Sequence, residues 1–340
     1  MNDLLLYASI GITLCFAFVN GLHDGGNVIA TVICSRAMRP VTALLWALIA
    51  MFVGPLVIGT AVARTIATSI LKPDSLEHLS TTTVYLTIIS GVAGAIALKL
   101  PTWFLGLPSS GSHALIGGLV GAGLAAMGTE GVSGEAVAKN VVLPLLVSPI
   151  LGIGLGFFVF AVIRTVFHRA HRRVGQSFST MQKPIMLILA ASCSSNEAQK
   201  SMGVVALILA AGSGRMHGAL DLPQWVVFSC AGALALGLAV GGWRIVKSVG
   251  SGICRLEPVH SFASQFTAAS LVLAASLIGA PVSAAQVVAS SVMGVGASRR
   301  LSGVRWTAAT NIAWAWLLTA PMSAGLGAGA FRLLRRIIVE

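Results

Sequence analysis

Long apolar stretches separated by short polar ones limit the possible folds of this chain more than any other feature. Three of the longest cover residues 41–63, 141–163 and 306–331, and about 20 apolar residues let a helix cross a bilayer. Only 9% of the 340 residues are charged, against about a quarter in a soluble domain. The apolar runs are unbroken rather than alternating, which favours helices over a membrane barrel. The sequence therefore predicts an all-α polytopic membrane protein with about ten to twelve membrane segments, including broken or re-entrant half-helices.

The charge balance is strongly basic, with 22 Lys or Arg residues against 10 Asp or Glu and a net charge of +12. Basic residues of membrane proteins gather in cytoplasmic loops, so this excess does not predict a nucleic-acid partner. The densest basic stretch covers residues 164–183 and is expected to be cytoplasmic. The basic tail at Arg332, Arg335 and Arg336 favours the opposite orientation, which leaves the topology open.

The two halves of the chain resemble each other at a constant spacing. The separation in sequence between Asp24 and Glu197 is the same as that between Ser110 and Ser283. Many secondary transporters contain such internal repeats, which are inverted when each repeat crosses the membrane an odd number of times. We therefore predict two inverted-topology repeats and three regions: an N-terminal membrane repeat (1–166), a basic cytoplasmic linker (167–183) and a C-terminal membrane repeat (184–340).

The first polar site, residues 20–27, interrupts an apolar run and contains three glycines. An ionisable residue at membrane depth costs about 2.5–3.5 kcal/mol on insertion scales, so it usually lines a cavity or meets a partner. Asp24 is therefore a candidate for holding a cation, and His23 can take up a proton near neutral pH. Asn27 adds neutral hydrogen-bonding groups. The alternative is an interfacial loop in which Asp24 only caps a helix.

The corresponding site in the second half contains Asn196, Glu197 and Gln199. Glu197 mirrors Asp24 and is a candidate for a second ion site. Lys200 follows Glu197 at an i,i+3 spacing, so the two side chains can meet on one helix face. A self-neutralised structural pair is therefore the alternative.

A proline and several serines form the third candidate element. Pro108 interrupts a helix, after which Ser109, Ser110 and Ser112 can cap a new half-helix whose positive end suits an anion. Ser283 and a second proline repeat the arrangement with fewer hydroxyls. Half-helices from two inverted repeats that meet near the midplane are used by transporters of anionic substrates. The alternative is that these serines form only interhelical contacts.

These motifs carry a resemblance to a known family. Residues 20–27, reading NGLHDGGN, resemble the amino-terminal signature of the inorganic phosphate transporter family of the low-affinity permease (PiT) type. Residues 103–118 are similar to its GLPxSxSHxLIG element, and residues 196–203 resemble its NDAQKxMG signature. The likeness covers residues 15–320 in the same order.

The resemblance implies an all-helical homodimer in membrane lipid, at the bacterial inner membrane, that imports inorganic phosphate by alternating access. The phosphate is carried alone or as a divalent metal–phosphate complex, with Mg²⁺ as one such metal, and is coupled to H⁺ or Na⁺. No other cofactor is implied, and whether the protein has a resident metal site stays open. The matched substrate positions are Asn27, Ser109, Ser110, Ser112, Asn196, Gln199 and Ser283, and the ion-coupling positions are Asp24 and Glu197, with His23 as the proton carrier.

The sequence departs from the family pattern in the second half. Glu197 replaces the usual Asp, and Ala284, Ala285 and Gln286 replace Thr-Thr-His, which removes two hydroxyls and an imidazole from that half-site. Ser283 and Gln286 also match a capping box, which explains Gln286 without a binding role. Sulfate or another tetrahedral oxyanion is therefore the alternative substrate.

Other function classes are less well supported. The chain has no G-x-S-x-G sequence for an intramembrane hydrolase and no nucleotide-binding G-x-x-x-x-G-K-[ST] sequence, so we expect neither an enzyme nor an ATP-driven pump. A passive anion channel is the remaining alternative. Both H⁺ and Na⁺ stay open as coupling ions, with the His23–Asp24 pair favouring H⁺. Replacing Asp24 with Asn is expected to abolish coupled uptake and to leave folding largely intact.

Overall fold

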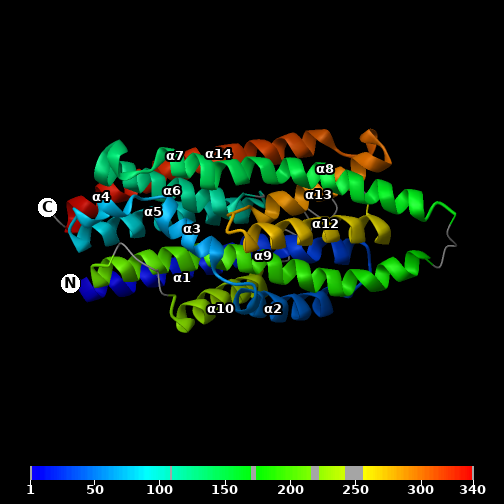
Figure 1. Ribbon diagram of the computed structural model, residues 1–340, viewed down its shortest axis with the longest axis horizontal. Coiled ribbons are helices and arrows are strands. Elements are labelled where there is room, and N and C mark those ends of the chain that lie inside the picture. Colours follow the sequence, from blue (N-terminus) through cyan, green and yellow to red (C-terminus); the bar gives the residue numbers. More distant parts are fainter. Residues whose placement is uncertain (1, 108, 170–173, 216–221, 242–255, 339–340) are drawn as a thin grey trace.

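The computed structural model describes residues 2–107, 109–169, 174–215, 222–241 and 256–338, and in these ranges it contains helices and no β-strand (Figure 1). The long helices are α1 (Asn2–Cys34), α2 (Pro40–Val57), α5 (Thr81–Leu105), α6 (Gly111–Met127), α8 (Leu143–Val166), α9 (Val174–Ser213), α10 (Gln224–Gly241), α12 (Pro258–Leu277), α13 (Ala284–Arg299) and α14 (Trp306–Ile338). The short elements are α3 (Ala61–Ser69), α4 (Pro73–Glu77), α7 (Gly134–Val137) and the single turns η1 (Gly128–Gly131), η2 (Ala138–Val142) and η3 (Leu301–Gly303).

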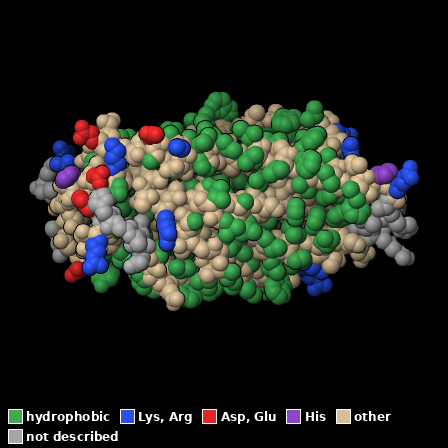
Figure 2. Space-filling view, in the orientation of Figure 1, with side chains coloured by type: hydrophobic (Ala, Val, Ile, Leu, Met, Phe, Trp, Pro, Cys, Tyr) green, Lys and Arg blue, Asp and Glu red, His purple; other side chains and the backbone are tan. Residues whose placement is uncertain are grey.

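The surface of the molecule is that of a protein embedded in lipid. Apolar side chains cover the face between the two ends of the molecule, whereas most charged side chains gather at those ends (Figure 2). Large apolar side chains such as Val57, Ile150 and Trp314 are more than half exposed, which a soluble monomer rarely allows over a wide area. Seven helical segments in the described ranges are long and apolar enough to cross a membrane. The chain is therefore a multi-pass helical membrane protein, and the predicted fold class is confirmed.

The helices of the two halves pack in reciprocal pairs. Helix α1 packs on α10 while α9 packs on α2, and α6 packs on α14 while α13 packs on α8. Helices α1 and α9 run in opposite directions along the long axis (Figure 1). This exchange of partners is the one expected when α1 to α8 and α9 to α14 are related by inversion, so the fold is consistent with the predicted inverted repeats.

Two helical hairpins enter the molecule from opposite ends. Helices α5 and α6 form one and α12 and α13 the other, and their turns approach each other near the middle (Figure 1). Helix α5 ends at Leu105, and the next residue, Gly106, has the left-handed backbone (φ 69°) that glycine favours after a helix C-terminus. The Ser112 hydroxyl donates to the Val282 carbonyl over 3.1 Å, so the two hairpin tips touch. Pro108, predicted to cause the first interruption, lies outside the described residues.

The predicted cytoplasmic linker is largely helical. Residues 174–183 form the first turns of α9, and residues 170–173 lie outside the described ranges. Gln182 is fully buried, and it accepts a hydrogen bond from the Ser35 hydroxyl at 2.7 Å and donates to the Pro258 carbonyl at 2.9 Å. These contacts tie the start of α9 to the end of α1 and the start of α12.

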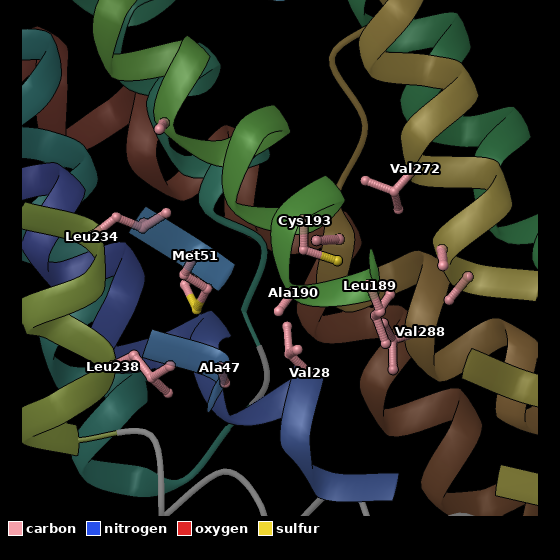
Figure 3. Close-up of a cluster of buried hydrophobic side chains, with 14 of the residues drawn as sticks. Val28, Ala47, Met51, Leu189, Ala190, Cys193, Leu234, Leu238, Val272 and Val288 are labelled. Atoms are coloured by element: carbon pink, nitrogen blue, oxygen red, sulfur yellow. The ribbon is translucent and has the colours of Figure 1, made fainter. Parts of the chain in front are cut away.

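An apolar core holds the two halves together around the hairpin tips. Figure 3 shows Val28 of α1, Met51 of α2, Cys193 of α9 and Leu234 of α10 among its buried side chains. Val272 of α12 belongs to the same cluster. Because helices from both halves contribute, the polar groups described next lie inside a packed apolar shell.

Candidate functional site

The polar residues of the first motif lie inside an unbroken helix. Helix α1 continues through residues 20–27, every one of which is buried. The glycines serve close packing rather than backbone opening, because a Cβ on Gly21 would overlap with the Leu234 carbonyl of α10. Residues 194–200 likewise lie inside α9. The alternative of an interfacial loop around Asp24 is therefore wrong.

Asp24 forms an ion pair with a lysine from the first hairpin. The Lys99 ammonium of α5 donates to Asp24 Oδ2 at 3.0 Å and to Asn20 Oδ1 at 2.6 Å, and both partners of the ion pair are buried. Lys99 was not identified from the sequence. It is the single charged residue of α5, and a lone lysine near the end of an apolar stretch is also the pattern of an interfacial anchor.

Glu197 has a lysine partner of its own. The Lys200 ammonium donates to Glu197 Oε1 at 2.6 Å, to the Ser112 hydroxyl at 2.6 Å and to the Val282 carbonyl at 2.7 Å. The i,i+3 pairing left open by the sequence is thus formed. Lys200 is fully buried and connects the tips of both hairpins, which the sequence did not suggest.

The two lysine–carboxylate pairs are joined through Asn20. Its side-chain nitrogen donates to Glu197 Oε2 at 3.4 Å, while its oxygen accepts from Lys99. Two carboxylates and two ammonium groups therefore share one buried region with no net formal charge. Buried charges are tolerated only when each has a partner and further hydrogen bonds. Lys99, Glu197 and Lys200 meet both conditions. Asp24 has its lysine partner, but its Oδ1 atom has no hydrogen-bond partner among the described residues.

A small cavity lies beside these pairs. Its volume is about 10 Å³, and its lining includes Asn20, Asp24, Ser194, Glu197 and Ala284. A cavity needs at least about 10–15 Å³ to hold one water molecule, so a tetrahedral oxyanion does not fit in this conformation. The surrounding helices must separate before such an anion can occupy the site.

His23 and Asn196 occupy corresponding places in the two halves, because the spacing that relates Asp24 to Glu197 also relates these two residues. His23 Nε2 lies 3.1 Å from the Ser109 hydroxyl at the first hairpin tip. Asn196 Oδ1 accepts at 3.2 Å from the backbone N–H of Val282, which is the counterpart of Ser109 in the second half. Each side chain thus ties its helix to the adjacent hairpin tip.

Two predicted substrate residues are occupied by contacts within the protein. The Asn196 amide nitrogen donates to the Ser276 hydroxyl at 3.1 Å and to the Ala280 carbonyl at 3.2 Å. Gln199 accepts from the Val62 N–H at the start of α3 at 2.8 Å and donates to the Ser195 hydroxyl at 2.8 Å. In this conformation, therefore, both side chains are bonded to groups of the protein itself.

The serines cap the half-helices unequally. Ser110 precedes α6, and its hydroxyl accepts from the backbone N–H of His113 at 3.3 Å. Ser283 precedes α13 but forms no side-chain capping bond with a described residue. The Oε1 atom of Gln286 also has no partner there, so the capping box expected between Ser283 and Gln286 is not formed. The second half-helix keeps more of its polar groups unpaired than the first.

Asn27 is the predicted substrate residue whose side chain has unused hydrogen-bonding groups. It is 2% exposed, and neither polar atom of its side chain has a hydrogen-bond partner among the described residues. Buried polar groups are nearly always paired in folded proteins, so an unpaired amide one helical turn after Asp24 is a candidate ligand for a substrate.

Comparisons with known proteins agree with this architecture. A model of the phosphate transporter family matches residues 20–327. A probable low-affinity inorganic phosphate transporter of Bacillus subtilis is 37% identical over 98% of this chain and 99% of its own length, and one of Rhizobium meliloti is 38% identical over 95% of each chain. A solved structure described as the sodium-dependent phosphate transporter has the same fold, with a TM-score of 0.91 and 24% identity over 98% of this chain and 100% of that one. The chain therefore belongs to the phosphate transporter family.

Proposed function

We propose that this protein is a secondary active transporter that imports inorganic phosphate across the cell membrane by alternating access. One observation carries the proposal: the tips of two opposed hairpins meet beside four buried charges, where Ser112 and Lys200 both reach the Val282 carbonyl. Family membership and the names of the Bacillus and Rhizobium relatives support phosphate as the substrate.

The groups around the hairpin tips suit an oxyanion. The first N–H groups of α6 and α13 provide positive helix ends, and Ser110, Ser112, Ser283 and Asn27 add donors. The Asp24 and Glu197 carboxylates would repel phosphate unless they kept their cations. Phosphate therefore enters when the hairpins separate, which breaks the contacts of Ser112 and Lys200 with the Val282 carbonyl.

The proposed coupling ion is a proton carried by His23. Its Nδ1 atom lies 3.5 Å from Asp24 Oδ1, and its Nε2 atom faces Ser109 and Thr102 at 3.1 and 3.3 Å. A proton taken up there adds positive charge beside a carboxylate at the hairpin tip. Na⁺ is the alternative, because the solved structure with the same fold is described as sodium-dependent. A divalent cation such as Mg²⁺, carried with phosphate, would neutralise its charge.

The distribution of exposed charge supports import toward the end at which α8 and α9 are connected. That end carries Arg36, Arg39, Lys183 and Arg299 but, among the described residues, the single acidic side chain of Glu257. Cytoplasmic ends of membrane proteins are enriched in Lys and Arg in this way. The termini would then lie outside. The proposal also includes a homodimer, in which two copies of the chain contact each other through part of their exposed apolar surface.

Uptake of radiolabelled phosphate into proteoliposomes tests the proposed function. We expect saturable accumulation that requires an imposed ion gradient and that excess sulfate does not suppress. Suppression by equimolar sulfate would favour the alternative oxyanion, and a non-saturable flux without accumulation would indicate a channel. Absence of phosphate flux in liposomes that contain correctly folded protein would overturn the proposal.

A further inference from the structure

Lys99 reaches the two oxygen atoms that a small cation would be expected to use. Its ammonium contacts Asp24 Oδ2 at 3.0 Å and Asn20 Oδ1 at 2.6 Å. A carboxylate oxygen and an amide carbonyl oxygen are the ligand types that hard cations prefer in proteins. Lys99 is fully buried, so its ammonium has exchanged water for these protein oxygens.

We propose that Lys99 is a tethered cation that takes the place of a free metal cation beside Asp24 and so removes Na⁺ dependence from this half of the transporter. The proposal rests on the proposed function and deepens it by assigning a residue that sets ion specificity. Because the ammonium is covalently attached to α5, it neutralises Asp24 but cannot be released on the other side of the membrane. Binding beside Asp24 therefore draws no energy from a Na⁺ gradient.

The second half shows that this lysine is not a general feature of the repeat. At the spacing that relates Asp24 to Glu197, the counterpart of Lys99 is Val272, an apolar side chain that is fully buried in the core. Glu197 instead pairs with Lys200 from its own helix, and the counterpart of Lys200 in the first half is Asn27. Each carboxylate thus has one lysine, but only the lysine beside Asp24 comes from a hairpin.

Because Lys99 lies on the α5–α6 hairpin, movement of this hairpin during the transport cycle changes the charge balance around Asp24. When the α5–α6 hairpin separates from α1, the ammonium moves away from Asp24 and leaves a buried carboxylate without its counter-charge. Such a charge is strongly unfavourable in a low-dielectric site. The pair therefore favours states in which the α5–α6 hairpin stays docked on α1 and Asp24 keeps its counter-charge.

Replacing Lys99 with Asn tests the proposal, because this shorter side chain frees the space beside Asp24 and offers a carbonyl oxygen. Wild-type protein and K99N are compared in sodium chloride and in choline chloride by phosphate uptake and by thermal unfolding of the purified protein. Lys99→Met, which fills the space without a charge, and Lys183→Asn, a change of an exposed lysine at the end of the bundle, are the matched controls.

We expect wild-type protein and K183N to have the same uptake and the same Tm in both salts. K99N should gain a saturable Na⁺-dependent rise in Tm, and its uptake should be about tenfold higher in Na⁺ than in choline when Na⁺ is at about ten times its dissociation constant. K99M should show neither response.

An equal Na⁺-dependent rise in Tm for wild-type protein and K99N would overturn the proposal, because a free cation site would then exist beside the lysine. Absence of a Na⁺ response in folded K99N would also overturn it. If K99N cannot be purified in either salt while the double variant D24N/K99M can, a solution cation cannot replace the ammonium and the proposal is wrong. Lack of phosphate uptake by every protein, wild type included, would count against the proposed function, while the Tm comparison would still decide the role of Lys99.

Discussion

Asn20 in the first half of the chain donates a hydrogen bond to the carboxylate of Glu197 in the second half, over 3.4 Å. The same amide group accepts from Lys99, the partner of Asp24. One side chain therefore connects the ion pairs of both halves at the point where the hairpin tips meet. A change in the charge of the Asp24–Lys99 pair therefore alters, through this amide, the hydrogen bonding of Glu197 in the other half.

Replacing Asn20 with Ala should reduce phosphate uptake by at least about a hundredfold. The change removes two hydrogen bonds to charged groups, each of which contributes about 1.5–3 kcal/mol. Uptake per reconstituted protein is the measurement. Asn140→Ala is the control because that amide donates to the Ser69 hydroxyl, away from the ion pairs. Similar uptake by both variants would show that the connection between the halves is not needed.

Replacing Asp24 with Asn should abolish uptake and also destabilise the protein by about 3–5 kcal/mol, because Lys99 then remains as a buried charge without its partner. This differs from the sequence-based expectation that folding stays largely intact. Removing both charges in D24N/K99M should restore most of the Tm but none of the uptake. A D24N protein with wild-type Tm and uptake would contradict the role assigned to the pair.

Replacing Gly111 with Ala should disturb the site through sterics alone. A Cβ at this position, at the start of α6, would overlap with the side-chain oxygen of Asn20, which Lys99 holds in place. Overpacking of this kind costs about 1–3 kcal/mol, and we expect at least a tenfold loss of uptake. Gly154→Ala on α8 is the control, since no atom lies within 4 Å of a Cβ there. Equal uptake by the two variants would show that Asn20 can move freely.

Replacing Ser110 with Ala should weaken phosphate binding more than replacing Ser283 with Ala. Ser110 caps α6 through the His113 N–H, and loss of such a cap costs about 0.5–2 kcal/mol in addition to any lost contact with phosphate. Ser283 forms no side-chain capping bond with a described residue. Phosphate titration of the purified proteins by calorimetry gives the comparison. Equal losses of affinity would mean that the half-sites are equivalent.

Sequence patterns predicted the parts of this structure that local chemistry determines. Apolar runs without charges predicted the membrane helices, and Pro108 followed by serines predicted an interrupted helix whose second part begins after Ser110. The constant spacing between the two halves also placed Asp24 and Glu197 in corresponding positions. Most of these features depend on residues close together in the chain, and the last depends on a repeat that the sequence itself displays.

Features that depend on packing between distant helices were missed. Lys99 looks like any lysine near the end of an apolar helix, and its pairing with Asp24 follows only from the packing of α5 on α1. The family resemblance implied Asn196 and Gln199 as substrate ligands, and in this conformation they accept hydrogen bonds from the backbone N–H groups of Val282 and Val62. Those partners are far away in the sequence, so no local pattern could have revealed them.

The proposed role of His23 leads to a further prediction. Asn196 already holds the second hairpin tip from the corresponding position, so an Asn should also hold the first tip. His23→Asn should therefore fold and bind phosphate while its uptake loses most of its response to a pH gradient. Loss of phosphate binding before any change in pH response would show that His23 serves only as a support for the tip.

Accumulation of radiolabelled phosphate in proteoliposomes under an imposed proton gradient, with Na⁺ absent throughout, is the most direct measurement of how this transporter is driven. We predict that an acidic exterior drives phosphate above its equilibrium level inside the liposomes, and that added Mg²⁺ increases the accumulated amount. Strict dependence of uptake on Na⁺, with no response to the pH gradient, would contradict the proton carried by His23.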